Sequence, residues 1–391
     1  MTKAKQEFYN AASSLKRSVI RFSNNVSKEL YKPDANFVRD MLLGMMTAQD
    51  VKLTKIAAAL KEEISLKHTE ERLRRKAATF AGQSKIEPLY MAKVLKSCRP
   101  DTLLLVDGGD IAKPYGKRFE GLSWLRDGSA GKLEKGLPTV GILALMPDKM
   151  PLPVYEKIYS YEKEFVSENH EAFLGLDFAQ KYFSNETIRV FDRGYDSTII
   201  CGKLLDSSVK FIVRAHGACM VTHKGKAMRV LDVAAHFKGK YALDFTDQKG
   251  KTAHCKVWIT RIEMEEHPLN LVICHGFGEK PLMLMTNVFD DDNAICIALA
   301  KGYLMRWKIE EFYRFKKQTF HFEDMRVMTL EAMNNINFLL NLLIGFLSMQ
   351  ATGGKNQPAI VLLVNHVKRI FDPKNLLYSL CVGIFAAFAL V

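Results

Sequence analysis

Apolar positions in the first hundred residues recur with the spacing of helices. They fall at Phe37, Val38, Met41, Leu42 and Met45, pause near residues 47–50, and resume at Val51, Ile56, Leu60 and Ile64. A recurrence every three or four residues gathers these side chains on one face of a helix. Thr69, followed by Glu70 and Glu71, has the composition of a helix start. The pattern therefore predicts a helical N-terminal region over residues 1–97.

The pattern after residue 97 changes to short apolar runs that alternate with amphipathic segments. Strands are predicted at residues 102–106, 140–146, 187–191 and 210–214, and helices at residues 169–183 and 197–205. Strands that alternate with helices indicate an α/β domain with a central sheet. Residues 98–216 are predicted to form the first part of this core.

Helical spacing is absent from residue 217 to residue 288, where β-type runs occur at residues 241–245, 253–262, 269–274 and 282–288. These runs predict a β-rich insertion in the α/β domain. Helical spacing returns after Asp290–Asp292, a triplet suited to the start of a helix. We expect residues 289–328 to supply a helix that completes the core. Residues 329–391 are expected to form a C-terminal helical region with a role in dimerisation.

The charge of the chain changes the picture of its partners. Lys and Arg number 56 against 43 Asp and Glu, a formal net charge of +13, which favours a polyanion such as nucleic acid or an anionic membrane surface. Two apolar stretches, Phe338–Leu347 and Leu380–Val391, fall short of the roughly 20 residues that cross a bilayer, so no membrane is expected. The polar N-terminus lacks a signal-peptide pattern, and a cytoplasmic location is expected.

Two aspartates stand where predicted strands end. Asp107 follows the run 103–106, and Asp192 follows the run 188–191. Open α/β sheets bind ligands at the ends of their strands, and carboxylates hold the paired divalent ions that assist phosphodiester hydrolysis. One Asp after a strand is usually a turn residue, so the occurrence of two in one domain is what points to a metal site.

A third carboxylate lies on a segment predicted to be one continuous helix, Lys301–Lys317. A rotation of about 100° per residue places Tyr303, Arg306, Glu310 and Lys317 within an arc of roughly 60°. Glu311 projects about 100° away from Glu310, so Glu310 is the better candidate ligand. Ordinary i,i+4 pairing explains Arg306 with Glu310, but it does not explain why Tyr303 and Lys317 join the same stripe.

These four residues have the spacing Y-x2-R-x3-E-x6-K, which resembles the signature of the DDE transposases of bacterial insertion sequences, in the branch named after insertion sequence four. The contexts Val106–Asp107 and Phe191–Asp192–Arg193–Gly194 are similar to the first and second Asp of that family. The resemblance runs from about Phe37 to Arg326. It implies an RNase H-like catalytic core interrupted by a β-rich insertion.

The resemblance also implies roles for particular residues. Asp107, Asp192 and Glu310 would bind two Mg²⁺ or Mn²⁺ ions in each active site, and Tyr303, Arg306 and Lys317 would hold DNA phosphates. The family often has Thr two residues after its first Asp, where this chain has Gly109 followed by Asp110. Asp110 is therefore an alternative ligand, although the strand end favours Asp107.

Other side chains are candidate DNA contacts of a less specific kind. They are Trp307, Arg193, Lys113, Arg72, Arg74 and Arg75. Core packing accounts for Trp307 equally well, and a solvated loop or helix face accounts equally well for the cations near the first Asp and on the N-terminal helix.

By this resemblance the chain is expected to be a bacterial cut-and-paste DNA transposase. It would cleave double-stranded DNA at the terminal inverted repeats of a mobile element and join the freed end to target DNA, as a homodimer assembled on DNA. Two alternatives remain open. One is an RNase H-like nuclease without strand transfer. The other is an inactive DNA-binding relic, suggested by the apolar last residues 388–391, as in a shortened reading frame.

Overall fold

The computed structural model describes residues 3–126, 131, 133–246, 252–289, 292–353, 358–368 and 376–389. The chain forms two compact units. The first unit comprises Met1–Arg99, Gly108–Glu171 and Glu311–Val391, and the second comprises Pro100–Asp107 and Ala172–Glu310. Strand β1 (Leu104–Ala112) and helices α6 (Glu168–Gln180) and α10 (Trp307–Thr319) contribute residues to both units.

The second unit is built on a mixed sheet. Strands β1, β5 (Arg189–Phe191) and β6 (Phe211–Arg214) are parallel neighbours, with Val106 opposite Phe191 and Phe191 opposite Val213. Strand β12 (Leu282–Thr286) lies antiparallel beside β6. These short apolar strands are buried, as expected for parallel strands covered on both faces. Helix α7 (Thr198–Asp206) links β5 to β6, and α9 (Asn293–Leu304) contacts both strands.

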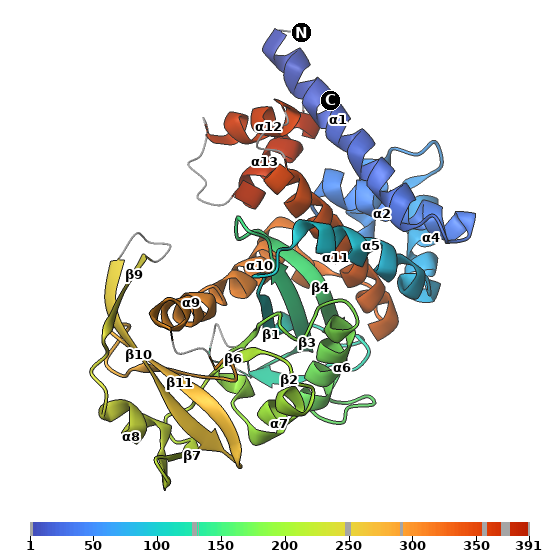
Figure 1. Cartoon of the computed structure of the whole chain (residues 1–391). Coiled ribbons are helices and arrows are strands. Elements are labelled where there is room, and N and C mark those ends of the chain that lie inside the picture. The colour runs from blue at the N-terminus through green and yellow to red at the C-terminus, as the bar shows by residue number, and fades with distance from the viewer. Residues whose placement is uncertain are drawn as a thin grey trace. The chain divides into compact units, whose positions relative to one another are not determined.

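The β-rich insertion adds further strands to the second unit. It contains β7 (Met220–His223), β8 (Lys226–Arg229), α8 (Val230–Ala235), β9 (Tyr241–Thr246), β10 (Thr252–Met264) and β11 (His267–His275). Strands β10 and β11 pair along nine successive residues as a long antiparallel ribbon, labelled in Figure 1. Strand β11 then pairs with β12, so the insertion extends the sheet of its own unit.

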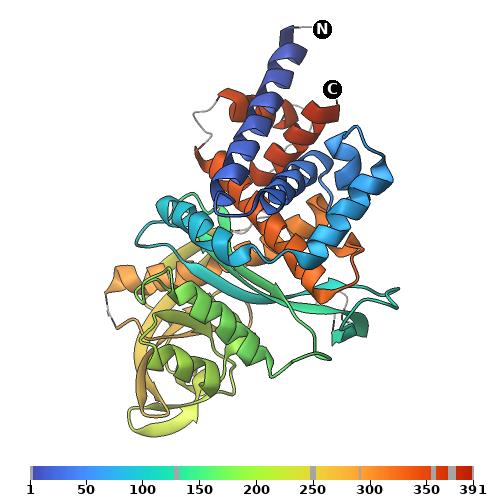
Figure 2. The ribbon, with the colours of Figure 1, turned by 90° about the vertical axis from the view of Figure 1, so that its right-hand side faces the viewer.

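Helices from both ends of the chain make up much of the first unit. They are α1 (Lys3–Val26), α2 (Lys32–Ala48), α3 (Leu53–Leu60), α4 (Leu66–Thr79), α5 (Gln83–Ser97), α11 (Leu330–Gly353), α12 (Pro358–Lys368) and α13 (Leu376–Ala389). Figures 1 and 2 both show α1, in blue, beside α12 and α13, in red.

The predicted start of α4 at Thr69 was wrong. The helix begins one turn earlier, because the Ser65 side chain accepts a hydrogen bond from the His68 amide as its N-cap. Thr69 is buried inside the helix instead, and its hydroxyl donates to Glu62.

The apolar stretch at 338–347 belongs to a longer element than the sequence pattern indicated. Helix α11 runs for 24 residues, which is long enough and apolar enough to cross a membrane by length and composition. The expectation that this stretch is too short was therefore wrong. However, 83% of its most apolar window is buried in the protein, where α11 packs against α2, α4, α5 and β4. The helix therefore serves as the core of the first unit.

The first unit also has strands of its own. Strand β3 (Leu133–Leu145) lies between β2 (Ser123–Arg126) and β1 in the sheet and pairs antiparallel with β4 (Pro151–Ile158). Pro151 and Pro153 are unusual in a paired strand, because proline cannot donate a hydrogen bond to the ladder. Strand β4 accommodates them because Pro151 is its first residue and the register shifts between Ile142 and Leu143, opposite Pro153.

The structure confirms the predicted fold class. It is an α/β protein in which a mixed sheet is extended by the strands of a β-rich insertion, with helical regions at both ends of the chain.

Candidate active site

Asp107 and Asp192 are neighbours because of strand register. The parallel pairing of β1 and β5 ends with Val106 opposite Phe191, so each aspartate is the first residue after the paired segment. The expected strand end at Val106 was wrong in one respect, since β1 continues to Ala112. What ends at Val106 is the pairing with β5. Asp107 lies beyond the end of this pairing, and its side chain is partly exposed beside Asp192.

The segment 301–317 is two helices, and the predicted continuous helix was wrong. Helix α9 ends at Leu304 and α10 begins at Trp307. The Arg306 amide donates to the carbonyl of Tyr303, three residues back, which is the bond of a tight helical turn. Gly302, a poor helix former, precedes the turn. The turn aims Tyr303 and Arg306 at the two aspartates.

One guanidinium connects all three predicted metal ligands. Arg306 Nη1 donates to Asp107 Oδ2 at 2.8 Å, and Arg306 Nη2 donates to Glu310 Oε1 at 2.6 Å. Arg306 Nε lies 3.8 Å from Asp192 Oδ1. Burial disfavours the charged form of Arg306, but the charges of Asp107 and Asp192 outweigh it and raise its pKa. The structure therefore brings the three carboxylates together around one buried cation.

Tyr303 completes the cluster from helix α9. Its hydroxyl donates to Asp192 Oδ1 at 3.0 Å. Burial and the nearby charge of Asp192 raise the pKa of Tyr303 to about 12, although Arg306 and Arg214 oppose the shift. The phenol is thus a neutral hydrogen-bond donor at physiological pH. Arg214 is not among the predicted site residues, because its only signal in the sequence is its position at the end of a predicted strand.

The donor set of this cluster fits a divalent metal ion. Three carboxylates supply the hard oxygen ligands that Mg²⁺ and Mn²⁺ prefer, and they already converge on a positive group. Within the described ranges, however, no group of three His, Cys, Asp or Glu side chains stands ready to hold an ion. Arg306 lies between the carboxylates, so the set fits a metal ion once this guanidinium moves away.

Lys317 has partners other than the three carboxylates. Its ammonium lies 3.3 Å from Asp110 Oδ2 and 3.0 Å from Glu323 Oε1, all within the first unit. Burial disfavours its charge, but Asp110 and Glu323 raise its pKa. Asp110, the alternative first ligand, is therefore occupied by a lysine, whereas Asp107 contacts Arg306.

The candidate DNA contacts near the aspartates differ in exposure. Arg193, directly after Asp192, is exposed, and the indole of Trp307 is 43% exposed. Lys113 is buried, and its ammonium donates to the carbonyls of Glu323 and Met325. Burial lowers the pKa of Lys113 to about 8. Arg193 and Trp307 are accessible to DNA in these positions. Lys113 is not, because its ammonium is bound to backbone carbonyls inside the protein.

The basic cluster on α4 is divided between internal pairs and an open groove. Arg72 binds Asp40 and Glu62, and Arg74 lies 3.6 Å from Glu71. Arg75 is exposed and lines a groove of about 500 Å³ together with residues from the start of α2, Tyr31 and Lys32 among them.

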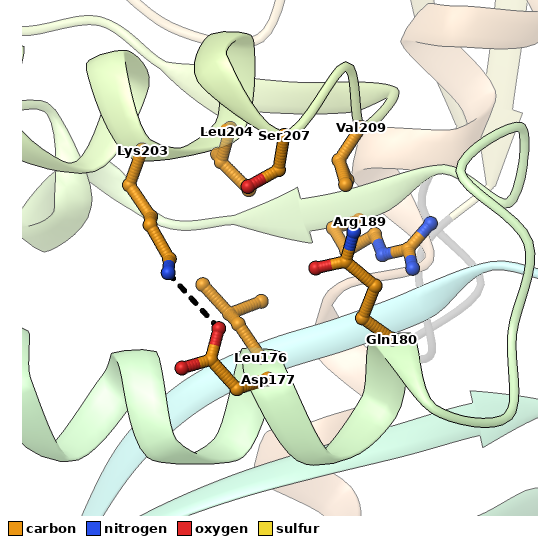
Figure 3. A pocket seen from close by; sticks show the side chains of 8 residues that line it. All are labelled: Leu176, Asp177, Gln180, Arg189, Lys203, Leu204, Ser207 and Val209. Carbon is orange, nitrogen blue, oxygen red and sulfur yellow. Dashed lines mark ion pairs between the residues drawn. The ribbon is translucent and has the colours of Figure 1, made fainter.

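A second cavity, between α6 and α7, is too small for a substrate. Figure 3 shows the Asp177–Lys203 ion pair at its edge, and Leu176, Leu204 and Val209 among its walls. Its volume of about 10 Å³ is close to the least that holds one water molecule. No substrate site follows from it.

Comparison with known proteins identifies a family. Residues 99–346, more than half of the chain, match the family described as Transposase DDE domain. No curated protein matches the chain. Among solved structures, the chain is similar to the piggyBac transposase in a cryo-EM structure of its synaptic complex with hairpin DNA. The sequence identity is 9% and the TM-score 0.46, over 98% of this chain and 80% of that chain.

Proposed function

Since the chain belongs to the Transposase DDE domain family, we propose that this DNA transposase cuts DNA at mobile-element ends and joins the freed 3′ end to target DNA, with Asp107, Asp192 and Glu310 as its metal ligands. Both reactions are phosphoryl transfers at one site. We also propose that the chain belongs to the branch named after insertion sequence four, and the spacing of Tyr303, Arg306, Glu310 and Lys317 supports this.

The observation that carries this proposal is the convergence of three carboxylates on one cation. They come from the parallel strands β1 and β5 and from the first turn of α10. Two divalent ions held there, Mg²⁺ or Mn²⁺, would activate the attacking oxygen and stabilise the leaving oxygen. Binding and positioning of the DNA phosphate would be done by the protein's own side chains.

Arg306 and Tyr303 are proposed to bind the DNA phosphate. For the carboxylates to ligate metal ions, Arg306 has to leave Asp107 and Glu310, and an approaching phosphate offers it a bidentate partner. Tyr303 stays a neutral donor and can transfer its hydrogen bond from Asp192 to a phosphate oxygen. The exposed Arg193 and Trp307 would then contact the strand on either side. DNA binding as a homodimer is part of the same proposal.

A matched pair of carboxylate variants tests the assignment. Glu310→Gln should abolish Mg²⁺- or Mn²⁺-dependent nicking of supercoiled plasmid while DNA binding by gel shift persists, because only a metal ligand is lost. Glu311→Gln, at the next position, should nick like the wild type. Full activity of Glu310→Gln would overturn the proposal. Joining of a pre-cut 3′ end by the wild type separates a transposase from a nuclease without strand transfer.

A further inference from the structure

The antiparallel ribbon of β2 and β3 has an exposed face in the first unit. Trp124 pairs with Lys135, and Arg126 pairs with Leu133. Directly paired residues project to the same side of a ribbon, so these four side chains share one face. Trp124 is 64% exposed and Leu133 is 70% exposed. On the other face, Ser123 and Leu125 are buried. A large aromatic side chain is thus held in solvent by a strand whose other face is anchored.

The exposed face is positively charged. The Lys135 ammonium lies over the Trp124 ring, 5.6 Å from its centre, and Arg126 is exposed. Among the residues that the structure describes, neither cation has a carboxylate within ion-pair distance, and Glu134 pairs with Leu125 on the opposite face. The two charges are therefore available to an anionic partner.

The loop before the ribbon extends the same kind of surface. The Lys113 amide donates to the carbonyl of Lys135, which ties the start of the loop to the ribbon. Tyr115, two residues on, is 94% exposed, and Lys117 and Arg118 are exposed as well. We call Trp124, Arg126 and Lys135 on the two strands, together with Tyr115, Lys117 and Arg118 on the loop that precedes them, the aromatic–basic ribbon.

We propose that the aromatic–basic ribbon binds an unpaired DNA segment, with Trp124 stacked on a base and Arg126 and Lys135 on the flanking phosphates. Aromatic rings that alternate with cations are how proteins hold unpaired strands. A second copy of the chain is a less favourable partner for this surface. In a symmetric contact, the cations of one copy (Lys117, Arg118, Arg126 and Lys135) would face the same cations of the other copy and repel them. The inference rests on the proposed function for its choice of DNA, but it concerns a surface other than the carboxylate cluster.

Two fluorescein-labelled DNAs of random sequence test this inference, a blunt duplex and the same duplex with a single-stranded overhang of about 8 nucleotides. Trp124→Ala should weaken binding of the overhang DNA about tenfold, because the stacking contact between the indole and a base is lost. Trp124→Phe should stay close to the wild type, and blunt duplex should bind all three proteins alike. Overhang DNA should quench the tryptophan fluorescence of the wild type more than that of Trp124→Phe.

Two controls make the result specific. Phe385→Ala removes another half-exposed aromatic side chain and should leave binding of both DNAs unchanged. The double variant Arg126→Gln, Lys135→Gln should reduce the slope of log binding constant against log salt concentration by about two. The control double variant Lys224→Gln, Lys226→Gln should reduce this slope less.

The inference is overturned if Trp124→Ala, folded by circular dichroism, binds the overhang DNA like the wild type, or if Phe385→Ala loses as much affinity. The proposed function fails separately, through metal-dependent nicking that survives in Glu310→Gln. If Trp124→Ala loses overhang binding while Glu310→Gln still nicks DNA, DNA binding by the ribbon is supported and the assignment of the carboxylates as metal ligands is refuted.

Discussion

At the scale of single residues, Arg306 has the most consequential position. Its guanidinium neutralises carboxylates that would otherwise repel one another in a half-buried cluster. The same side chain is the phosphate ligand of the proposed reaction. In that proposal Arg306 has two competing partners, the carboxylates when no metal ion is bound and a DNA phosphate when metal ions bind the carboxylates.

Replacing Arg306 should therefore affect metal binding and catalysis in opposite directions. Arg306→Gln removes the charge that competes for Asp107 and Glu310, so Mn²⁺ affinity should rise about tenfold, the equivalent of about 1.4 kcal/mol. DNA nicking should fall because a phosphate ligand is lost. Calorimetric titration with Mn²⁺ measures the first effect. Arg193→Gln, an exposed neighbour of Asp192, should bind Mn²⁺ like the wild type, and weaker binding by Arg306→Gln would contradict the competition.

Lys113 gives a prediction about pH. Burial lowers its pKa to about 8 in the folded protein, below the unfolded value of about 10.4. Between these two values the unfolded chain binds the extra proton, so the stability of the wild type rises with pH across that window. Relative to Lys113→Met, the wild type should gain about 2 kcal/mol between pH 7 and pH 10. Urea denaturation at both pH values measures this, and a difference independent of pH would refute it.

At the scale of elements, α10 is fixed by a buried ion pair beyond its first turn. The Lys316 ammonium lies 2.6 Å from Glu156 Oε2 on β4 and 2.6 Å from Asn337 Oδ1 on α11. It also lies 4.0 Å from the centre of the Phe322 ring. Burial lowers the pKa of Lys316, against the attraction of Glu156. These contacts hold the C-terminal half of α10 within the first unit.

Breaking this pair from one side should destabilise the protein. Lys316→Met leaves the Glu156 carboxylate buried without its cation, which costs about 3–5 kcal/mol. Adding Glu156→Gln should recover most of the loss, because the amide is uncharged and still accepts a hydrogen bond from Asn341. Urea unfolding of the single and double variants measures both effects. Equal stability of the two variants would show that the charge itself is unimportant.

Local pattern explains which elements the sequence could predict. Strands β1, β5 and β6 and helices α6 and α7 occur close to their expected positions, because apolar periodicity reports burial directly. Strand β4 was hidden by its prolines, and the break at residues 305–306 by a periodicity that continues across it. Strand β4 forms with a register shift between Tyr155 and Pro153, which depends on its pairing with β3 and not on periodicity within β4. The turn at 305–306 is made by backbone hydrogen bonds, such as the one from the Arg306 amide to the Tyr303 carbonyl, that leave the apolar spacing unchanged.

At the scale of the whole molecule, local sequence pattern predicts only part of the candidate site. The sequence pattern singled out Asp107, Asp192 and Glu310, since strand-end and signature positions are local features. It did not reveal that Arg306 contacts Asp107, which lies 199 residues earlier in the chain. Nor did it reveal that Lys113 is buried while Trp124 is exposed, because burial of a long side chain depends on packing between distant segments.

The register of β1 and β5 has a consequence for how this site tolerates change over time. Asp107 and Asp192 meet because each is the first residue after a paired Val106 or Phe191. Side chains alternate between the faces of a strand, so a shift of one residue sends a carboxylate to the opposite face. Apolar substitutions within either strand should thus drift freely among relatives. Insertions or deletions of a single codon there should be removed by selection, however conservative their chemistry.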